Sequence, residues 1–422
     1  MRLLLIVLFA FFMMPLQGQT FKAGAAKRSI DPDHLIPISG GMGKPVMPTG
    51  KAGLLSVRAL VVEKGETRVA FVSIDNLGWP SFLGDQARKL VKGIKPENIL
   101  IGATHAHSAP DAYGFPDETG KINIDEPYLK WCIRQMAAAI NEAVANLQPA
   151  SLKTAVAEAK GKIAYNYYAE KLYDPRCGVI QVTATAGKRK GEKIATLINY
   201  ATHPEILGTG RGLMSPDLCG PLYDRIEANG GGMGIFMNSA QGGMVTADTR
   251  RENGKEANDW NECIRIGNLM ADEALRIIDK AIVLNNADLY CSAQKIEFPV
   301  ESADMKMVLE HSPFVQNTRK DGDKYFISST LNLVNIGKAQ IITIPGEALP
   351  NIGFYLKRKM KSSQPFLFGL TNDSFGYMLA KVDFNGFERY NYVSRVSLGE
   401  MTGEILINEE LKMVNANPAP TN

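Results

Sequence analysis

Two short apolar runs of this sequence lead into the dipeptide Thr-His. Residues 98–101 precede Thr104-His105-Ala106-His107, and residues 195–198 precede Thr202-His203-Pro204. A short apolar run bounded by small and polar residues is typical of a buried strand. In open α/β sheets, ligands bind at the carboxyl ends of the strands. The pattern therefore predicts an α/β fold whose strand ends carry the functional side chains.

The histidines of these strand ends suggest a metal site. His105 and His107 stand two residues apart, and side chains at i and i+2 of a strand point to the same face. Imidazole is the commonest protein ligand for metals, and the chain has only 5 histidines. A second Thr-His at His203 strengthens the metal interpretation. A single histidine is more often a plain core or surface residue, so spacing alone leaves both interpretations open.

Further apolar and amphipathic segments continue the α/β pattern. The clearest helix is expected over 126–147, which is alanine-rich and amphipathic. Segment 302–323 is polar and is expected to be a peripheral insertion. The other expected strands are 20–28, 55–63, 68–74, 151–158, 179–185, 232–238, 287–299, 327–336, 339–344 and 365–370. The other expected helices are 80–91, 217–229, 253–280 and 348–360.

Polar residues after several predicted strands are candidates for the same site. Asp75 and Glu347 each follow a strand, and each is either near a ligand or a helix cap. Ser239 is a candidate nucleophile or substrate-binding hydroxyl, but its surroundings lack the Gly-x-Ser-x-Gly pattern of serine hydrolases. The glycines of 40–43 permit close approach of backbone to a ligand, and they equally suit an irregular turn.

The first residues are typical of a secretory signal peptide. Met1-Arg2 precedes an apolar run over 3–14, which is too short to span a bilayer. Residues 15–19 then have the character of a signal-peptide cleavage region. We expect a signal peptide over 1–19, one catalytic domain over 20–412 and a disordered tail over 413–422. The mature protein is expected to be periplasmic or secreted, without a transmembrane segment. Export would allow one or two disulfides among the 5 cysteines, with pairing left open.

Charge excludes one class of partner. The formal net charge is +3, and no Lys/Arg cluster alternates with aromatic residues as a nucleic-acid groove would need. We therefore expect a small-molecule substrate, a lipid or a glycoconjugate, and no nucleic acid. Contact with a membrane surface stays open.

Five short phrases occur in a succession that resembles the catalytic domain of the neutral/alkaline ceramidase family. Members of this family are exported or surface zinc amidases. The resemblance covers about residues 21–399. The phrases are Ala103-Thr104-His105-Ala106-His107-Ser108, Thr202-His203-Pro204, Asn238-Ser239-Ala240-Gln241-Gly242, Pro345-Gly346-Glu347 and Asn372-Asp373-Ser374-Phe375-Gly376-Tyr377.

The resemblance implies a large α/β domain with a mixed sheet and one zinc ion per chain. The implied zinc ligands are His105, His203, Glu347 and Tyr377. His107 would hydrogen-bond the substrate or the tetrahedral intermediate and is the best candidate for the general acid, while Ser239 would sit beside the scissile carbonyl. The implied substrate-binding residues are Gly43, Asn166 and Gln241.

The sequence departs from the family in its substrate-binding parts. Asn166-Tyr167 stands where the family has Asn-Arg, Gly243 stands where Asn or Asp is usual, and we expect no C-terminal β-sandwich domain. The expected function is zinc-dependent cleavage of the N-acyl amide bond of ceramide or a related lipid by an activated water. A deacylase of a glycan or of another ester or amide, and a non-enzymatic binding protein, remain as alternatives.

Overall fold

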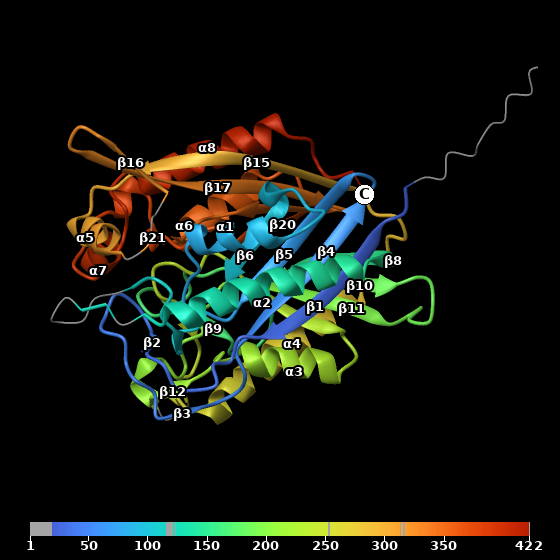
Figure 1. Cartoon of the computed structure of the whole chain (residues 1–422), viewed down its shortest axis with the longest axis horizontal. Coiled ribbons are helices and arrows are strands. Elements are labelled where there is room, and N and C mark those ends of the chain that lie inside the picture. Colours follow the sequence, from blue (N-terminus) through green and yellow to red (C-terminus); the bar gives the residue numbers. More distant parts are fainter. Residues whose placement is uncertain are drawn as a thin grey trace, which may run out of the picture.

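The structure, a computed structural model, describes residues 19–114, 121–122, 124–251, 254–312, 314 and 317–421. The signal peptide expected over 1–19 thus lies outside the described residues, apart from Gln19. The described chain forms two sheets with helices on their outer sides (Figure 1). None of its described helices is long and apolar enough to cross a membrane.

The larger sheet has eight strands in the order β13-β11-β10-β8-β1-β4-β5-β6. It is mixed, because β11 and β13 pair in parallel, as do β5 and β6, whereas the other neighbours are antiparallel. The predicted mixed α/β fold is therefore confirmed. The strands are β1 (Lys22–Ser29), β4 (Ser56–Lys64), β5 (Thr67–Ile74), β6 (Ile99–Ala103), β8 (Gln148–Glu158), β10 (Arg176–Ala184), β11 (Lys193–Tyr200) and β13 (Met233–Asn238).

Strand β4 shows why this sheet lies between two layers. Eight of its nine residues are buried. Successive side chains of a strand point to opposite faces, and Ala59 and Val61 pack in one apolar cluster while Leu60 and Val62 pack in another. A strand that is apolar on both faces needs a covering layer on each side.

A second sheet covers one of these faces. Its strand order is β15-β17-β18-β20, with β16 paired to β17. Phe71 of the larger sheet meets Phe368 of the smaller one edge to face, with ring centroids 5.9 Å apart. The strands are β15 (Leu289–Pro299), β16 (Thr318–Asp321), β17 (Lys324–Ile336), β18 (Ala339–Thr343) and β20 (Gln364–Phe368).

Helices cover the outer faces of both sheets. On the larger sheet, α1 (Ser81–Leu90) and α2 (Glu126–Ala145) cover one half, and α3 (Cys219–Ala228) and α4 (Trp260–Asp279) cover the other. On the smaller sheet, α6 (Pro350–Lys359) and α8 (Thr402–Ala416) form the outer layer. Figure 1 shows α8 beyond β15 and β17, and α3 and α4 on the far side of the larger sheet.

Loops and short elements gather at the end of the sheets away from the C-terminus, where α5 (Ala303–His311) and α7 (Tyr390–Arg395) lie (Figure 1). Four short strand pairs are β2 (Ile38–Ser39) with β7 (Ala109–Pro110), β3 (Gly50–Lys51) with β12 (Leu213–Met214), β9 (Ala164–Asn166) with β14 (Val245–Ala247), and β19 (Glu347–Ala348) with β21 (Tyr377–Met378). Short 3-10 turns are η1 (Pro96–Asn98), η2 (Thr209–Arg211) and η3 (Lys381–Asp383).

The larger sheet curls so that its two edge strands approach each other. Ser73 of β5 donates a hydrogen bond of 2.6 Å to the carbonyl of Phe236 in β13. A Cβ added to Gly102 of β6 would lie 2.6 Å from the terminal carbon of Met237. Strand ends that are far apart in the strand order therefore meet in space.

Three expectations from the sequence differ from the structure. Segment 302–323 is not a peripheral insertion, because it contains α5, whose Met305 and Val308 are buried. The expected disordered tail begins inside α8, and Asn417 and Pro418 are hydrogen-bonded to β15 and β17. All five cysteines are free, and four of them are buried, so no disulfide forms among them.

Glu410 of α8 is an unpaired acid in the core. It is fully buried, and neither of its carboxyl oxygens has a hydrogen-bond partner. Burial raises the pKa of Glu410 well above its ordinary value. The folded protein therefore keeps this side chain neutral and buries polar atoms without compensation, which destabilises the packing of α8.

We predict that Glu410→Leu raises the free energy of unfolding by about 1–3 kcal/mol. In the unfolded chain a glutamate ionises above about pH 4.3. Because the folded pKa of Glu410 is higher than the unfolded one, wild-type stability falls as pH rises past the unfolded pKa. The gain in stability of Glu410→Leu is therefore larger at about pH 8 than at about pH 4. Thermal unfolding at both pH values measures it. Glu388→Leu, at an exposed position, should change stability by less than about 0.5 kcal/mol; a destabilised Glu410→Leu would show that the carboxyl is paired.

Candidate metal centre

The side chain of Asn238, at the end of β13, joins the ends of three strands. Its Nδ2 donates to the carbonyl oxygens of Thr104 at 3.1 Å and Thr202 at 2.8 Å, which follow β6 and β11. Its Oδ1 accepts from the backbone N–H groups of Thr202 at 3.3 Å and Ser239 at 2.9 Å. The two Thr-His sequences are thereby held next to each other, although they are far apart in the chain.

His105 is held in an unusual backbone conformation directly after β6. Its φ is 72°, a value uncommon outside glycine and sustained only where the surroundings fix it. Its backbone N–H donates to the carbonyl of Asn76 at 2.9 Å. Its Nδ1 lies 2.6 Å from the carbonyl oxygen of Leu77. Because a carbonyl only accepts, Nδ1 carries a proton, and this contact orients the ring so that Nε2 points away from Leu77.

His203 is oriented in the same way by a different carbonyl. Its backbone N–H and its Nδ1 both donate to the carbonyl of Val245, at 2.9 Å and 2.7 Å. Its Nε2 lies 3.1 Å from Oε2 of Glu347, and Nε2 of His105 lies 3.3 Å from the same oxygen. Two imidazoles whose rings are oriented by backbone carbonyls thus converge on one carboxylate.

Glu347 and Tyr377 come to this point as partners in a two-stranded pair. They are in register in the parallel pair β19–β21, so their side chains leave the same face. The N-cap residue of helix α6 is Leu349, not Glu347, and no side chain of the described residues hydrogen-bonds to the first turn of this helix. The helix-cap interpretation of Glu347 is therefore excluded. The Tyr377 hydroxyl donates to the sulfur of Met244 at 3.6 Å.

Burial and charge act against each other in this cluster. Burial alone would favour the neutral acid of Glu347, but His105 and His203 outweigh it and hold the pKa of Glu347 well below its ordinary value. Burial likewise opposes a charged His203, yet the hydrogen bond to Glu347 raises the pKa of His203 to about 9. Burial, with a contribution from Glu347, raises the pKa of Tyr377 well above its ordinary value. A cation among these groups would favour the ionised forms of both Glu347 and Tyr377.

His107 completes a cluster of three imidazoles. The ligand atoms of His105, His107 and His203 lie within 4.8 Å of one another. Burial, together with the neighbouring His105, lowers the pKa of His107 to about 3. Its Nδ1 is 3.5 Å from Oε2 of Glu205, while its buried Nε2 has no hydrogen-bond partner. His107 is therefore a neutral imidazole with one nitrogen available.

The metal-ligand candidates border a small cavity, which we call the inner chamber. It is lined by His105, His107, Glu347 and Tyr377, and offers about 70 Å³ to water-sized molecules. His203 is not part of the wall and contacts Glu347 from behind it. The remaining wall is formed by Gly40, Gly41, Met42, Leu77, Tyr113, Met305, Val308, Ser374, Gly376, Tyr392 and Val396.

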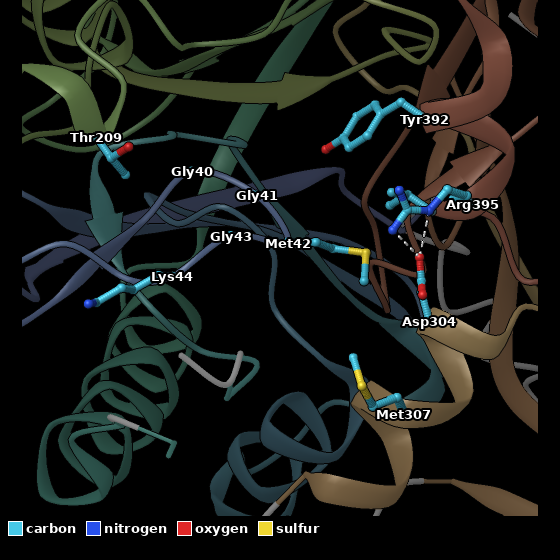
Figure 2. Close-up of a pocket in the computed structure, with 11 residues that line it drawn as sticks. Gly40, Gly41, Met42, Gly43, Lys44, Thr209, Asp304, Met307, Tyr392 and Arg395 are labelled. Carbon is cyan, nitrogen blue, oxygen red and sulfur yellow. Dashed lines mark hydrogen bonds and ion pairs between the residues drawn. The ribbon is translucent and has the colours of Figure 1, made fainter. Parts of the chain in front are cut away.

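A larger cavity of about 440 Å³, which we call the vestibule, adjoins the inner chamber. The two share Gly40, Gly41, Met42, Tyr392 and Val396 as lining residues. Figure 2 shows the ion pair between Arg395 and Asp304 on one side of the vestibule, and Lys44 and Thr209 on the other. The ion-paired atoms are 2.8 Å apart. The vestibule is therefore lined by both charged and apolar side chains, among them Met42 and Met307.

The other predicted site residues do not line the inner chamber. Gly43 lines the vestibule. Ser239 and Gln241 are buried after β13, line neither cavity, and have unpaired side-chain polar atoms. Asn166 does not reach either cavity: its Nδ2 donates to the carbonyl of Leu172 and its Oδ1 accepts from two backbone N–H groups of the same loop. Its contacts are those of a residue that shapes a turn.

Several residues of the site were not predicted from the sequence. Asn238 was noted only as part of a phrase, and its bridging role depends on the curl of the sheet. Leu77 and Val245 act through backbone carbonyls, which no residue type reveals. Glu205 could have been found, because it stands two residues after His203 and near the predicted cluster.

Comparison with models of known protein families gives no match, and neither does comparison with curated protein sequences. Solved structures do match. The crystal structure of neutral ceramidase from Pseudomonas aeruginosa has a TM-score of 0.76 and 15% sequence identity, and covers 96% of this chain and 76% of that one. A ceramidase complexed with C2 has a TM-score of 0.74 and 15% identity, covering 96% and 77%.

The fold is that of neutral ceramidase. The resemblance inferred from five short phrases is thus confirmed at the level of the fold.

The residues present fit a zinc ion. Zinc takes four ligands from nitrogen, sulfur and oxygen donors, and binds histidine in its neutral form. The Nε2 atoms of His105 and His203 point toward the ionised Glu347, where a bound cation would take the place of a proton on Nε2, and Tyr377 follows from the paired strand. Carbonyl oxygens that accept the opposite ring N–H are the usual outer partners of metal-binding histidines. The group is therefore suited to hold a metal.

We predict that His203→Ala lowers zinc affinity by more than about 100-fold, since losing only an outer partner costs about 10- to 100-fold. Zinc retained after dialysis, measured by elemental mass spectrometry, tests this. His34→Ala is the matched control, because the His34 side chain is 66% exposed and pairs with Asp33 outside the cluster. Zinc content equal to wild type in His203→Ala would remove this residue from the ligand set.

Proposed function

We propose that the protein is a zinc-dependent hydrolase that cleaves the N-acyl amide bond of ceramide or a related N-acyl lipid with an activated water. The observation that carries the proposal is the convergence of two imidazoles, His105 and His203, on one oxygen of Glu347 beside a cavity. Tyr377 is the proposed fourth ligand. The likeness in fold to neutral ceramidase supports this choice of substrate class.

The metal would supply one part of the chemistry. A bound zinc ion supplies Lewis acidity and lowers the pKa of a water molecule to about 7. His105, His203, Glu347 and Tyr377 are the residues that would hold it. The remaining tasks, which are proton transfer and placement of the substrate, belong to the side chains of the chain itself.

We assign proton transfer to His107. His107 lines the inner chamber and its Nε2 has no hydrogen-bond partner among the described residues, so Nε2 is placed to accept a proton from the attacking water and return it to the leaving amine. Glu205, whose carboxyl the histidines hold below its ordinary pKa in spite of burial, faces the other ring nitrogen and stabilises the protonated ring. Ser239 lines neither cavity, so we do not assign it a proton-transfer step.

The organisation of the chain follows from the same proposal. We propose that 20–412, together with the rest of α8 to Ala416, forms the catalytic unit, and that residues 1–19 direct its export to the periplasm or beyond. The comparison structures match 96% of the chain, which supports a single unit.

The function is tested by fatty-acid release from a short-chain ceramide by the mature protein, with and without a zinc chelator. We expect release that the chelator stops and added zinc restores, because the activated water depends on the metal. Mass spectrometry of the released acid gives the measurement. A protein that holds zinc in a one-to-one ratio and releases no acid from any N-acylsphingosine would contradict the substrate assignment.

His107→Ala separates proton transfer from metal binding. We expect kcat to fall by about 10²- to 10⁴-fold, which is the usual contribution of a general acid–base, while zinc content stays at the wild-type level. Steady-state kinetics and elemental analysis of the same preparation provide the two readouts. Loss of zinc in this variant would make His107 a ligand instead, and His34→Ala again controls for the general effect of removing a histidine.

A further inference from the structure

The inner chamber has an apolar wall that includes Leu77 and Val308, which do not line the vestibule. Leu77 and Val308 form a buried cluster of their own, against which Met42 and Tyr113 pack. Met305, one turn before Val308 on α5, adds a second buried side chain to this wall. The apolar surface thus lies in the same small cavity as the metal-ligand candidates.

The polar groups of this wall are already bonded to the protein. The Tyr113 hydroxyl donates to the carbonyl of Ser374 at 3.0 Å. The Ser374 hydroxyl accepts from the backbone N–H of Trp79 at 3.2 Å. What this wall offers a substrate is therefore mainly hydrocarbon surface.

The two cavities suit the two sides of an amide. The carbonyl must lie near His105, His107 and Glu347, which line the inner chamber. The leaving amine takes up a proton, and the vestibule beyond offers charged and hydroxyl side chains such as Lys44 and Thr209. The acyl group is left to face the apolar wall of Leu77 and Val308.

The inner chamber is too small for a long acyl chain. Its 70 Å³ compares with roughly 10–15 Å³ for one water molecule, so it holds on the order of five atoms of water size. The helix α5 sets this limit, because Met305 and Val308 project from it into the chamber and are 9% and 7% exposed.

We propose, on the basis of the amidase function above, that the inner chamber binds the acyl group and that Met305 and Val308 restrict the substrate to short acyl chains of about two to four carbons. The preferred substrate class is thus a short-chain N-acyl amine with a polar amine part, and the long-chain N-acyl lipids are poor substrates.

The test is the chain-length profile of the zinc-loaded mature protein. We compare kcat/KM for N-acetyl-, N-butanoyl-, N-octanoyl- and N-hexadecanoylsphingosine under identical micellar conditions. We expect a fall of at least about ten-fold between the butanoyl and octanoyl substrates, because the longer chain must displace packed side chains. Calorimetric binding of butanoate and octanoate gives a readout that does not depend on turnover, and should show the same order.

Two variants of α5 assign the limit to its side chains. Val308→Ala and Met305→Ala should each raise the ratio of kcat/KM for the octanoyl substrate to kcat/KM for the acetyl substrate by about ten-fold, since they enlarge the chamber. Lys306→Ala is the matched control, because Lys306 lies on the same helix and lines neither cavity. Val308→Phe should lower kcat/KM for the butanoyl substrate more than kcat/KM for the acetyl substrate.

The outcomes separate this inference from the function on which it rests. Hydrolysis of all four substrates at similar rates, or a profile that neither enlarged variant shifts, would overturn the short-chain inference and leave the amidase function standing. Failure of the zinc-loaded wild type to hydrolyse any chain length would overturn the amidase function itself. A short-chain preference that moves to longer chains in Val308→Ala supports both.

Discussion

The candidate site depends on one buried amide. Asn238 uses both of its side-chain ends to hold three strand ends together, with two donated and two accepted hydrogen bonds. Each such bond contributes about 1 kcal/mol net, whereas a buried partner left unsatisfied costs about 1–3 kcal/mol. An apolar residue at this position would leave the carbonyls of Thr104 and Thr202 unpaired. The histidines that follow these residues owe their closeness to this amide.

Unusual backbone conformations also help to position the loops of the candidate site. Among the six described non-glycine residues with positive φ are His105, Met244, Leu370 and Asn372. All four are in loops that meet at the candidate site: Met244 contacts Tyr377, and Leu370 and Asn372 bond the backbone of β6. Such conformations cost about 1–3 kcal/mol each and persist only where surrounding contacts impose them. Strain is therefore concentrated where the orientation of the imidazoles has to be fixed.

The sequence predicted those parts of the fold that depend on local pattern. Residues 68–74 are a short, mostly apolar run and residues 126–147 have an amphipathic helical pattern, and these segments fold as β5 and α2. The Thr-His sequences were found for the same reason, because strand ends are visible in the apolar pattern. The substrate-binding role of Asn166 was taken from the family resemblance. In the structure, the side-chain amide of Asn166 hydrogen-bonds to backbone groups of its own loop.

What the sequence did not predict depends on contacts between distant segments. The polar composition of 302–323 suggested a surface insertion, yet α5 turns Met305 and Val308 inward at i and i+3. Only two of the apolar residues of this short helix are buried, which is too few to mark a buried face in the sequence. The tail after 412 was judged by its prolines, and the hydrogen bonds that hold it to β15 and β17 cannot be read from composition. The curl that brings β13 to β6 is likewise a property of the whole sheet.

Leu77 contacts both the candidate metal centre and the apolar wall of the inner chamber. Its carbonyl orients the ring of His105, and its side chain forms part of the apolar surface. A change of side chain there would move the backbone that orients a proposed ligand, so chemistry and chain-length selection cannot be altered separately at this residue. Helix α5 contributes to the same wall, and no ligand candidate lies on it. If the chamber binds the acyl group as we propose, substitutions on α5 can change acyl selectivity while the orientation of the imidazoles stays fixed.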